Sequence, residues 1–295
     1  MPKRVRVHVD GRDLTLSNLD KVLYPAAGFT KAEVIDYYSR VAPVLLPHVR
    51  GRPLTVKRYP NGVTGESFFE KNAPAHTPEW IRQVTLPTHG STRDRDTIDF
   101  PVMDDLPTLV YYANLAALEL HVPMWRVTDR GRPRSPDTLV FDLDPGAPAT
   151  IVECCRVADL LREALHDDGL APVPKTSGRK GMQLYVPLRD SWIDDPREYA
   201  RVLARRLELA HPERVTSVMA KRARPGKVFI DWSQNNPAKT TIAPYSLRAA
   251  LTPTVSTPLT WAEVEGCDDP SALVFTAPDV LVRVEEHGDL FAALT

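Results

Sequence analysis

The stretch Leu139–Gly146 constrains the fold more than any other part of the sequence. It reads Leu-Val-Phe-Asp-Leu-Asp-Pro-Gly, an apolar run that predicts a buried strand ending at its Pro-Gly pair. Side chains alternate between the two faces of a strand, so Asp142 and Asp144 should share one face while Leu143 points into a core. The segment therefore requires a sheet with one apolar face and one face that carries two neighbouring carboxylates.

Two carboxylates side by side on a strand repel each other, and near a core at least one would be driven to take up a proton. A divalent cation removes this conflict, because carboxylate oxygens are hard ligands that suit Mg²⁺ or Mn²⁺. Asp142 and Asp144 could equally end a strand in solvent. Asp231, at the end of a second short apolar run, adds a third carboxylate. Three aspartates at the ends of hydrophobic strands match the ligand set of a two-metal phosphoryl-transfer site.

A glycine-containing loop, Ser177–Gly181, lies between the two carboxylate strands. A turn of this kind can present backbone N–H groups to an anion, and the Ser177 hydroxyl and the Lys180 ammonium add donors. The spacing of a Walker P-loop is absent, and a plain hairpin is the simpler interpretation of the loop by itself. In the strand that follows, Gln183 should face away from Met182 and Leu184.

The first clear helix signal is the capping box Thr30–Glu33, which predicts a helix that begins after Thr30. Lys31 then lies in the first turn, where the helix dipole disfavours a cation, and Lys21 lies just upstream. Lysines beside a helix N-terminus are typical of a phosphate site. An exposed lysine at a small energetic cost is the alternative.

Residues 53–71 predict two strands joined by a turn at Asn61-Gly62. Phe68 and Phe69 lie beside basic residues in this segment and could stack on bases. Because adjacent residues of a strand face opposite ways, we expect one of the two rings in the core. His121, in an extended run after a helical segment that starts near residue 107, is typical of a structural histidine.

Strand and helix patterns mix along the chain without regular βαβ alternation, which predicts an α+β fold. The 37 basic and 38 acidic residues give a net charge of −1, so any nucleic-acid site must concentrate its positive charge locally. Three cysteines form no disulfide framework, and no apolar run approaches the roughly 18 residues of a membrane span. These features favour a reduced, intracellular protein.

Three motifs together carry a family resemblance: Phe141–Gly146, Thr176–Gly181 and Phe229–Trp232. They resemble the three motifs of the archaeo-eukaryotic primase superfamily. From about Leu14 to Leu290 the chain is similar to the polymerase domain of bacterial DNA ligase D, which serves end joining. The resemblance implies one domain over residues 1–295, with mixed and antiparallel sheets flanked by helices around an active-site cleft. Its catalytic motifs would lie within 139–248 and its DNA-binding elements within 14–72.

The resemblance also implies roles for individual residues. The catalytic metal ligands would be Asp142, Asp144 and Asp231. The nucleotide would be bound by Ser177, Gly178, Lys180, Gln183, Arg248, His121 and Lys57. The 5′-phosphate of a downstream DNA strand would be bound by Asn18, Lys21 and Lys31, and the template would pack on Phe68 and Phe69.

The activity implied by the resemblance is that of a template-directed DNA/RNA polymerase that uses two Mn²⁺ or Mg²⁺ ions. It would add nucleotides, ribonucleotides by preference, to primer 3′ ends at gaps or double-strand breaks that carry a downstream 5′-phosphate. Its partners would be that DNA, nucleoside triphosphates, a DNA ligase and an end-binding repair protein. We expect a monomer in the bacterial cytoplasm, associated with the nucleoid and with no membrane partner.

One departure from the family pattern concerns the second motif, which usually ends in a histidine and here has Gln183. Glutamine donates a hydrogen bond but carries no charge, so nucleotide binding is expected to be weaker. The alternative is a catalytically weak module that binds DNA ends. A two-metal nuclease is a further alternative, although it would leave Ser177, Lys180 and Arg248 without a purpose.

Overall fold

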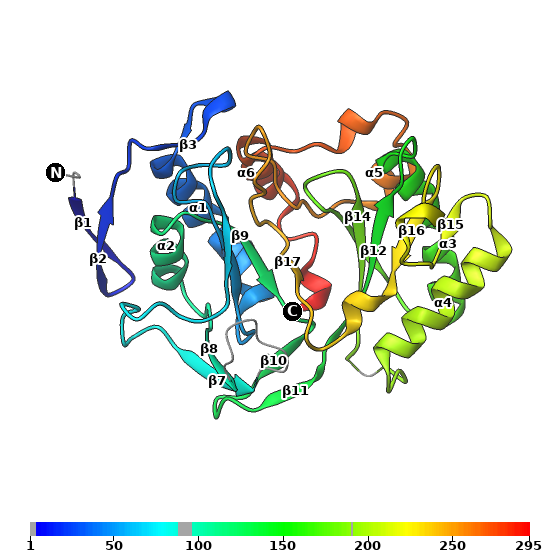
Figure 1. Ribbon diagram of the computed structural model, residues 1–295, viewed down its shortest axis with the longest axis horizontal. Coiled ribbons are helices and arrows are strands. Elements are labelled where there is room, and N and C mark those ends of the chain that lie inside the picture. The colour runs from blue at the N-terminus through cyan, green and yellow to red at the C-terminus, as the bar shows by residue number, and fades with distance from the viewer. Residues whose placement is uncertain (1–3, 88–95, 190) are drawn as a thin grey trace.

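The computed structural model describes residues 4–87, 96–189 and 191–295, and two main sheets organise them (Figure 1). The four-stranded sheet has the order β17-β9-β5-β6 and the five-stranded sheet has the order β13-β14-β12-β16-β15. The first consists of β5 (Thr55–Arg58), β6 (Phe68–Glu70), β9 (Ala117–Val122) and β17 (Thr241–Ile242). The second consists of β12 (Thr138–Pro145), β13 (Val173–Thr176), β14 (Met182–Pro187), β15 (Val215–Thr216) and β16 (Val228–Asp231).

Each main sheet has its own hydrophobic core and its own helices (Figure 1). The helices that share a core with the four-stranded sheet are α1 (Lys31–Val49), α2 (Leu106–Asn114) and α6 (Ala277–His287). Those that share a core with the five-stranded sheet are α3 (Ile151–Asp167), α4 (Pro196–Ala210) and α5 (Trp261–Glu265). The helices cover one face of each sheet. On the other face of the five-stranded sheet, Asp142 and Asp144 follow Val140, which is buried in a small separate core with Tyr185 and Phe291.

Four small hairpins and five short 3₁₀ helices complete the described part of the chain. The hairpins are β1 (Arg4–Val9) with β2 (Arg12–Ser17), β3 (Val22–Tyr24) with β4 (Phe29–Thr30), β7 (Gln83–Pro87) with β8 (Thr97–Pro101), and β10 (Trp125–Val127) with β11 (Pro133–Pro136). The 3₁₀ helices are Pro25–Ala27, Lys221–Ala223, Trp232–Asn235, Pro270–Leu273 and Ala292–Leu294.

The local patterns of the sequence are confirmed where their signals are strongest. Thr30 caps α1 in a full capping box: its side chain accepts from the Glu33 backbone N–H, and the Glu33 carboxylate accepts from the Thr30 N–H. In β12, Leu143 lies in the core of the five-stranded sheet while Asp142 and Asp144 face away from it. The mixture of helices with mostly antiparallel sheets confirms the α+β expectation. No helix within residues 4–87, 96–189 and 191–295 is long and apolar enough to cross a membrane.

The expectation that Phe68 or Phe69 lies in the core is wrong. The two rings are 44% and 59% exposed. Their strand, β6, is at the edge of the four-stranded sheet, where it pairs with β5. The side chains do point to opposite faces, since Phe69 packs edge-on against His121 and Phe68 lies under the Arg58 guanidinium.

Candidate active site

The three aspartates lie on one face of the five-stranded sheet. Asp142 of β12 is directly opposite Asp231 of the antiparallel neighbour β16, and Asp144 is two residues further along β12. The residues between them, Leu143 and Ile230, are also opposite each other and are fully buried in the core on the other face. The strand register therefore brings together three carboxylates that the sequence separates by almost 90 positions.

Asp142 shows the electrostatic consequence of this grouping. Burial and the negative charges of Asp144 and Asp231 together raise the pKa of Asp142 to about 7, against the opposing effect of the hydrogen bond from Gln183. The conflict that the sequence predicts for a carboxylate pair is thus present in the fold. It is the kind of conflict that a bound divalent cation relieves.

The other two aspartates have partners of their own. Asp231 accepts hydrogen bonds from the Ser233 backbone N–H at 2.9 Å and from the Gln234 side chain at 3.1 Å. Asp144 lies 3.7 Å from the Arg224 guanidinium. Within the described residues, no three His, Cys, Asp or Glu side chains are already arranged as a metal site. The donor set nevertheless fits Mg²⁺ or Mn²⁺, because three carboxylates share one sheet face and Asp142 is destabilised as an anion by its neighbours.

Gln183 is held between Asp142 and a buried lysine. Its Nε2 donates to Asp142 Oδ1 at 3.0 Å, and its Oε1 accepts from Lys175 Nζ at 2.6 Å and from the Tyr185 hydroxyl at 3.3 Å. Ammonium groups only donate and carboxylates only accept, so these neighbours fix the orientation of the amide. Gln183 is 4% exposed and uses both ends of its amide inside the protein.

Lys175 itself was not identified from the sequence. Its side chain is fully buried, and its second hydrogen bond, also 2.6 Å, goes to the Ser256 hydroxyl. Burial lowers the pKa of Lys175, and the charge of Asp142 opposes this shift. Gln183 is a local partner, directly opposite Lys175 in the β13–β14 hairpin, but Ser256 is distant in sequence, and no local pattern predicts that this lysine is buried.

The Ser177–Gly181 loop joins β13 and β14 and lies against Arg248. The Ser177 Oγ accepts from the backbone N–H groups of Arg179 and Gly181, both at 3.3 Å, so the loop folds around this hydroxyl. Gly178 has φ +69°, and a Cβ there would lie 2.5 Å from Cγ of Arg248. Only glycine permits this close approach. At the end of the loop, the side chain of Lys180 is exposed to solvent.

A second residue missed in the sequence, Glu119 of β9, connects the loop to the four-stranded sheet. Its buried carboxylate accepts from His121 Nε2 at 3.1 Å and lies 3.3 Å from Arg179 Nη2 and 3.5 Å from Arg248 Nη1. Burial alone would raise the pKa of Glu119, but the His121 hydrogen bond and the Arg248 charge outweigh it and lower the pKa to about 2. Glu119 thus holds two arginines and a histidine from three segments of the chain.

Lys57 shares this face of the four-stranded sheet, because it is directly opposite Glu119. Its ammonium lies 5.3 Å from the ring centroids of both Tyr59 and Phe69. Phe69 packs in turn on His121, with ring centroids 5.5 Å apart. The face therefore presents a cation and an aromatic ring beside the Glu119 group.

The lysines of the expected 5′-phosphate site lie on the other side of the four-stranded sheet. Lys31 is 5% exposed, and its Nζ donates to the backbone oxygen of Asn114 at 2.8 Å. Lys21 donates to the Asn61 side chain at 2.9 Å. Burial lowers the pKa of Lys31, and the charges of Lys21 and Arg58 lower it further. The simpler interpretation, an exposed lysine, therefore does not hold for Lys31. It is buried and lies near two other cations, Lys21 and Arg58. Asn18, the third residue of the expected site, is exposed.

Comparison with known proteins identifies the family. A family model described as "LigD, primase-polymerase domain" matches residues 30–291. The chain belongs to the LigD primase-polymerase domain family. It is 47% identical over 280 residues to the multifunctional non-homologous end joining protein LigD of Mycolicibacterium smegmatis, and 33% identical over 277 residues to the bifunctional LigD of Bacillus subtilis. These matches confirm the resemblance found in the sequence.

The relatives differ from this chain in length. The matches cover 95% and 93% of the chain but only 36% and 43% of the two relatives, so the chain spans well under half of each. Among solved structures, the polymerase domain of Mycobacterium tuberculosis ligase D in complex with DNA matches with a TM-score of 0.87 and 44% identity. That match covers 95% of this chain and 97% of the solved one. The agreement with the LigD primase-polymerase fold thus extends over nearly the whole described chain.

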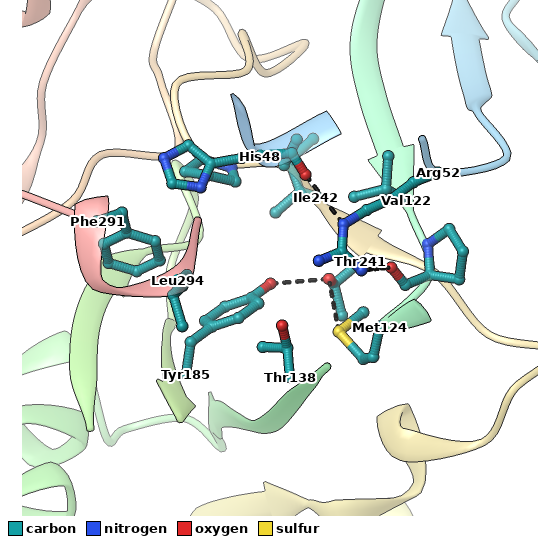
Figure 2. A pocket seen from close by; sticks show the side chains of 13 residues that line it. His48, Arg52, Val122, Met124, Thr138, Tyr185, Thr241, Ile242, Phe291 and Leu294 are labelled. Carbon is teal, nitrogen blue, oxygen red and sulfur yellow. Dashed lines mark hydrogen bonds between the residues drawn. The ribbon is translucent and has the colours of Figure 1, made fainter. Parts of the chain in front are cut away.

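A separate cavity of about 30 Å³ is lined by Tyr185 and Thr138 of the five-stranded sheet and by Val122 and Thr241 of the four-stranded sheet (Figure 2). The hydroxyls of Tyr185 and Thr241 are hydrogen bonded to each other at 2.7 Å, and Met124 and Phe291 are among the lining side chains. This volume admits about two water molecules and no nucleotide. The cavity is therefore too small to be the nucleotide site expected for the family.

Proposed function

We propose that the chain is a template-directed nucleotidyltransferase that extends primer 3′ ends at DNA gaps or breaks with a downstream 5′-phosphate. The observation that carries the proposal is the register of β12 and β16, which sets Asp142, Asp144 and Asp231 on one sheet face. Arg248 and the Ser177–Gly181 loop, which lie against each other, would supply donors for a triphosphate. Acidic and cationic groups in this arrangement suit phosphoryl transfer better than they suit a binding module.

Asp142, Asp144 and Asp231 would hold two Mn²⁺ or Mg²⁺ ions. When bound, the ions would lower the pKa of the primer hydroxyl and stabilise the charge on the triphosphate. The protein's own contribution would be to keep one oxygen of Asp142 fixed by Gln183 Nε2. Lys175 would act on Asp142 through Gln183, because its ammonium group keeps the Gln183 amide in the orientation that donates to Asp142.

The nucleotide would be bound by Ser177, Gly178, Lys180, Arg248, His121 and Lys57. Glu119 supports this assignment, because its carboxylate binds both Arg248 and His121 and so holds their side chains together. Lys180 is exposed and Lys57 is partly exposed, so both ammonium groups remain accessible to a nucleotide. Gln183 was expected to reach the triphosphate as well. Its burial favours a role through Asp142 instead, in which a neutral amide fills the place of the family histidine.

The DNA would contact the other side and the edge of the four-stranded sheet. Asn18, Lys21 and Lys31 would bind the downstream 5′-phosphate, and Phe68 and Phe69 would pack on the template. The grouping of Lys21, Lys31 and Arg58 supports the first assignment, and the exposure of both rings on an edge strand supports the second.

The biological setting of the proposal comes from the relatives, which are non-homologous end joining proteins. The solved neighbour is a polymerase domain in complex with DNA. We infer the same role in end joining here, with a ligase and an end-binding repair protein as partners. We also infer a preference for ribonucleotides, action as a monomer and a place at the bacterial nucleoid, as the resemblance implies.

Primer extension tests this function. The protein is given Mn²⁺ and a one-nucleotide gap whose downstream strand carries either a 5′-phosphate or a 5′-hydroxyl, with ribonucleotides or deoxyribonucleotides. We expect templated addition that is faster with the 5′-phosphate and with ribonucleotides, and that stops with a chelator. Tight binding to the gapped DNA without any addition under these conditions would instead support the weak end-binding module.

A further inference from the structure

The β1–β2 hairpin at the N-terminal edge of the molecule has two different faces (Figure 1). On the inner face, Leu14 and Leu16 are buried in the core of the four-stranded sheet. On the outer face of β1, Arg4 and Arg6 are exposed, and their cross-strand partners are the neutral Ser17 and Thr15. The hairpin is therefore anchored on one side and presents two arginines to solvent on the other.

Within the part of the chain that the structure describes, no acidic side chain neutralises these two arginines. Among the described residues, no carboxylate oxygen lies within ion-pair distance of Arg4 or Arg6. The one acidic side chain paired on the outer face, Asp13, is 2.9 Å from His8. In a chain with net charge −1, an exposed pair of unneutralised arginines is a local positive surface. Such a surface fits a polyanion.

This surface continues directly into the proposed 5′-phosphate site. Arg4 is opposite Ser17, the residue that precedes Asn18. Asn114 at the end of α2 ties the two regions together. Its side chain accepts from the Ser17 N–H at 3.0 Å and donates to the Thr15 oxygen at 3.3 Å, while its backbone oxygen accepts from Lys31. The hairpin and the lysine site are thus fixed relative to each other.

The spacing of the arginines also suits a nucleic-acid backbone. Residues two apart on a strand, such as Arg4 and Arg6, are about 6.7 Å apart, which is the axial rise of about two nucleotides. A duplex that begins at the 5′-phosphate site and runs outward would pass the two arginines in order. Regularly spaced phosphates are the polyanion that this geometry favours.

We propose that the outer face of the β1–β2 hairpin, led by Arg4 and Arg6, binds the phosphate backbone of the duplex downstream of the 5′-phosphate. The inference rests on the proposed function, which supplies the 5′-phosphate site as the starting point. It adds a second contact that reads duplex DNA beyond the end itself and carries no sequence information.

The test compares the binding of two DNAs by fluorescence anisotropy. One is gapped DNA with a 5′-phosphorylated downstream strand, and the other is the same primer–template without that strand. We expect Arg4→Ala combined with Arg6→Ala to weaken binding of the gapped DNA by about five- to thirtyfold. The variant should also reduce the slope of log K against log salt by about 2. The DNA without the downstream strand should bind as before.

Arg12→Ala is the matched control. Arg12 belongs to the same hairpin but lies on its inner face, with its guanidinium 5.5 Å from the Trp80 ring centroid. Its loss should therefore change the affinity for either DNA by no more than about twofold. Equal losses on both DNAs for the double variant would mean general electrostatic attraction and overturn the inference. Unchanged binding, in a parent that still prefers the 5′-phosphate, would overturn the inference and leave the proposed function standing. A parent indifferent to the downstream strand would overturn both.

Discussion

At the scale of single residues, Asp142 links the stability of the fold to the chemistry of the site. Its folded-state pKa of about 7 is above the value of about 3.9 for an aspartate in an unfolded chain. The folded protein therefore holds this proton more tightly than the unfolded chain does. The stability that Asp142 contributes is fully present below about pH 4, the unfolded-state pKa, and is lost as the pH rises through about 7.

Asp142→Asn should therefore stabilise the metal-free protein while it abolishes nucleotide addition. The amide keeps an oxygen that can accept from Gln183, and it removes the buried charge. In urea denaturation with a chelator, the gain in free energy of unfolding should be larger at pH 8 than at pH 5 by about 1–3 kcal/mol. A gain of the same size at both pH values would contradict the assignment.

Gln183 and Lys175 should behave as a coupled pair. Removal of one leaves the other with an unsatisfied buried polar group, so Gln183→Met and Lys175→Met should each cost about 2–4 kcal/mol. The double variant should cost at least about 1 kcal/mol less than the sum. The free energies of unfolding from urea titrations form the double-mutant cycle, and additive costs would show that the two residues act independently.

At the scale of elements, the Ser177–Gly181 loop depends on one glycine. Gly178→Ala must place a Cβ at positive φ and within 2.7 Å of the Val255 backbone, so it should move the loop away from Arg248. We expect a loss of about 2–4 kcal/mol in the free energy of unfolding and a higher nucleotide KM.

Gly11→Ala provides the control for that loss. Gly11 has φ +78°, but a Cβ there would have no neighbour within 4 Å, so only backbone strain of about 1 kcal/mol should result. The difference between the two variants measures the close approach of the loop to Arg248. Equal losses would mean that the approach contributes nothing.

The elements that could be predicted from the sequence are those whose signals are local. The capping box at Thr30, the alternation in β12 and the hairpin around Ser177–Gly181 depend on residues a few positions apart. Lys175 and Glu119 could not be found in this way. Their partners, such as Ser256 for Lys175 and Arg248 for Glu119, are about 80 and 130 positions away, and only the tertiary fold brings them together.

The exposure of Phe68 and Phe69 also could not be predicted from the local sequence pattern. Alternation correctly placed Phe68 and Phe69 on opposite faces, but it did not show that β6 is an edge strand on which both rings are exposed. The position of a strand within a sheet is set by pairing with distant strands. For the same reason the sequence predicted the three aspartates as a group but did not specify the direct pairing of Asp142 with Asp231.

At the scale of the whole molecule, the acidic and the cationic groups of the candidate site lie on different sheets. The five-stranded sheet carries the carboxylates, and the four-stranded sheet carries Glu119 with its cationic partners. The sheets are joined where Arg179 reaches Glu119 and where the hydroxyl of Tyr185 meets that of Thr241. Because these joints lie next to the proposed nucleotide site, binding there should depend on how the sheets are held together.

In the proposed function, DNA ends are recognised on the other side of the four-stranded sheet, at Asn18, Lys21 and Lys31. We expect gapped DNA with a 5′-phosphate to bind about tenfold tighter than the 5′-hydroxyl form, because charge-assisted contacts contribute about 1.5–3 kcal/mol each. Lys21→Ala combined with Lys31→Ala should erase this preference and leave single-strand affinity mostly unchanged. Arg40→Ala, an exposed change on the same helix as Lys31, is the control and should keep the preference. Equal affinity of the parent for the two ends would contradict the 5′-phosphate site.

The central claim, that the three aspartates on one sheet face perform nucleotidyl transfer, is tested most directly by Asp231→Asn. The amide retains an oxygen for the Ser233 N–H, so the local turn should be preserved and the melting temperature should change little. The measurement is the single-turnover rate of adding one nucleotide to a gapped primer with saturating Mn²⁺ and nucleotide. We expect a rate at least about a hundredfold below that of the parent. A rate within a few-fold of the parent would remove Asp231 from the site and contradict the account.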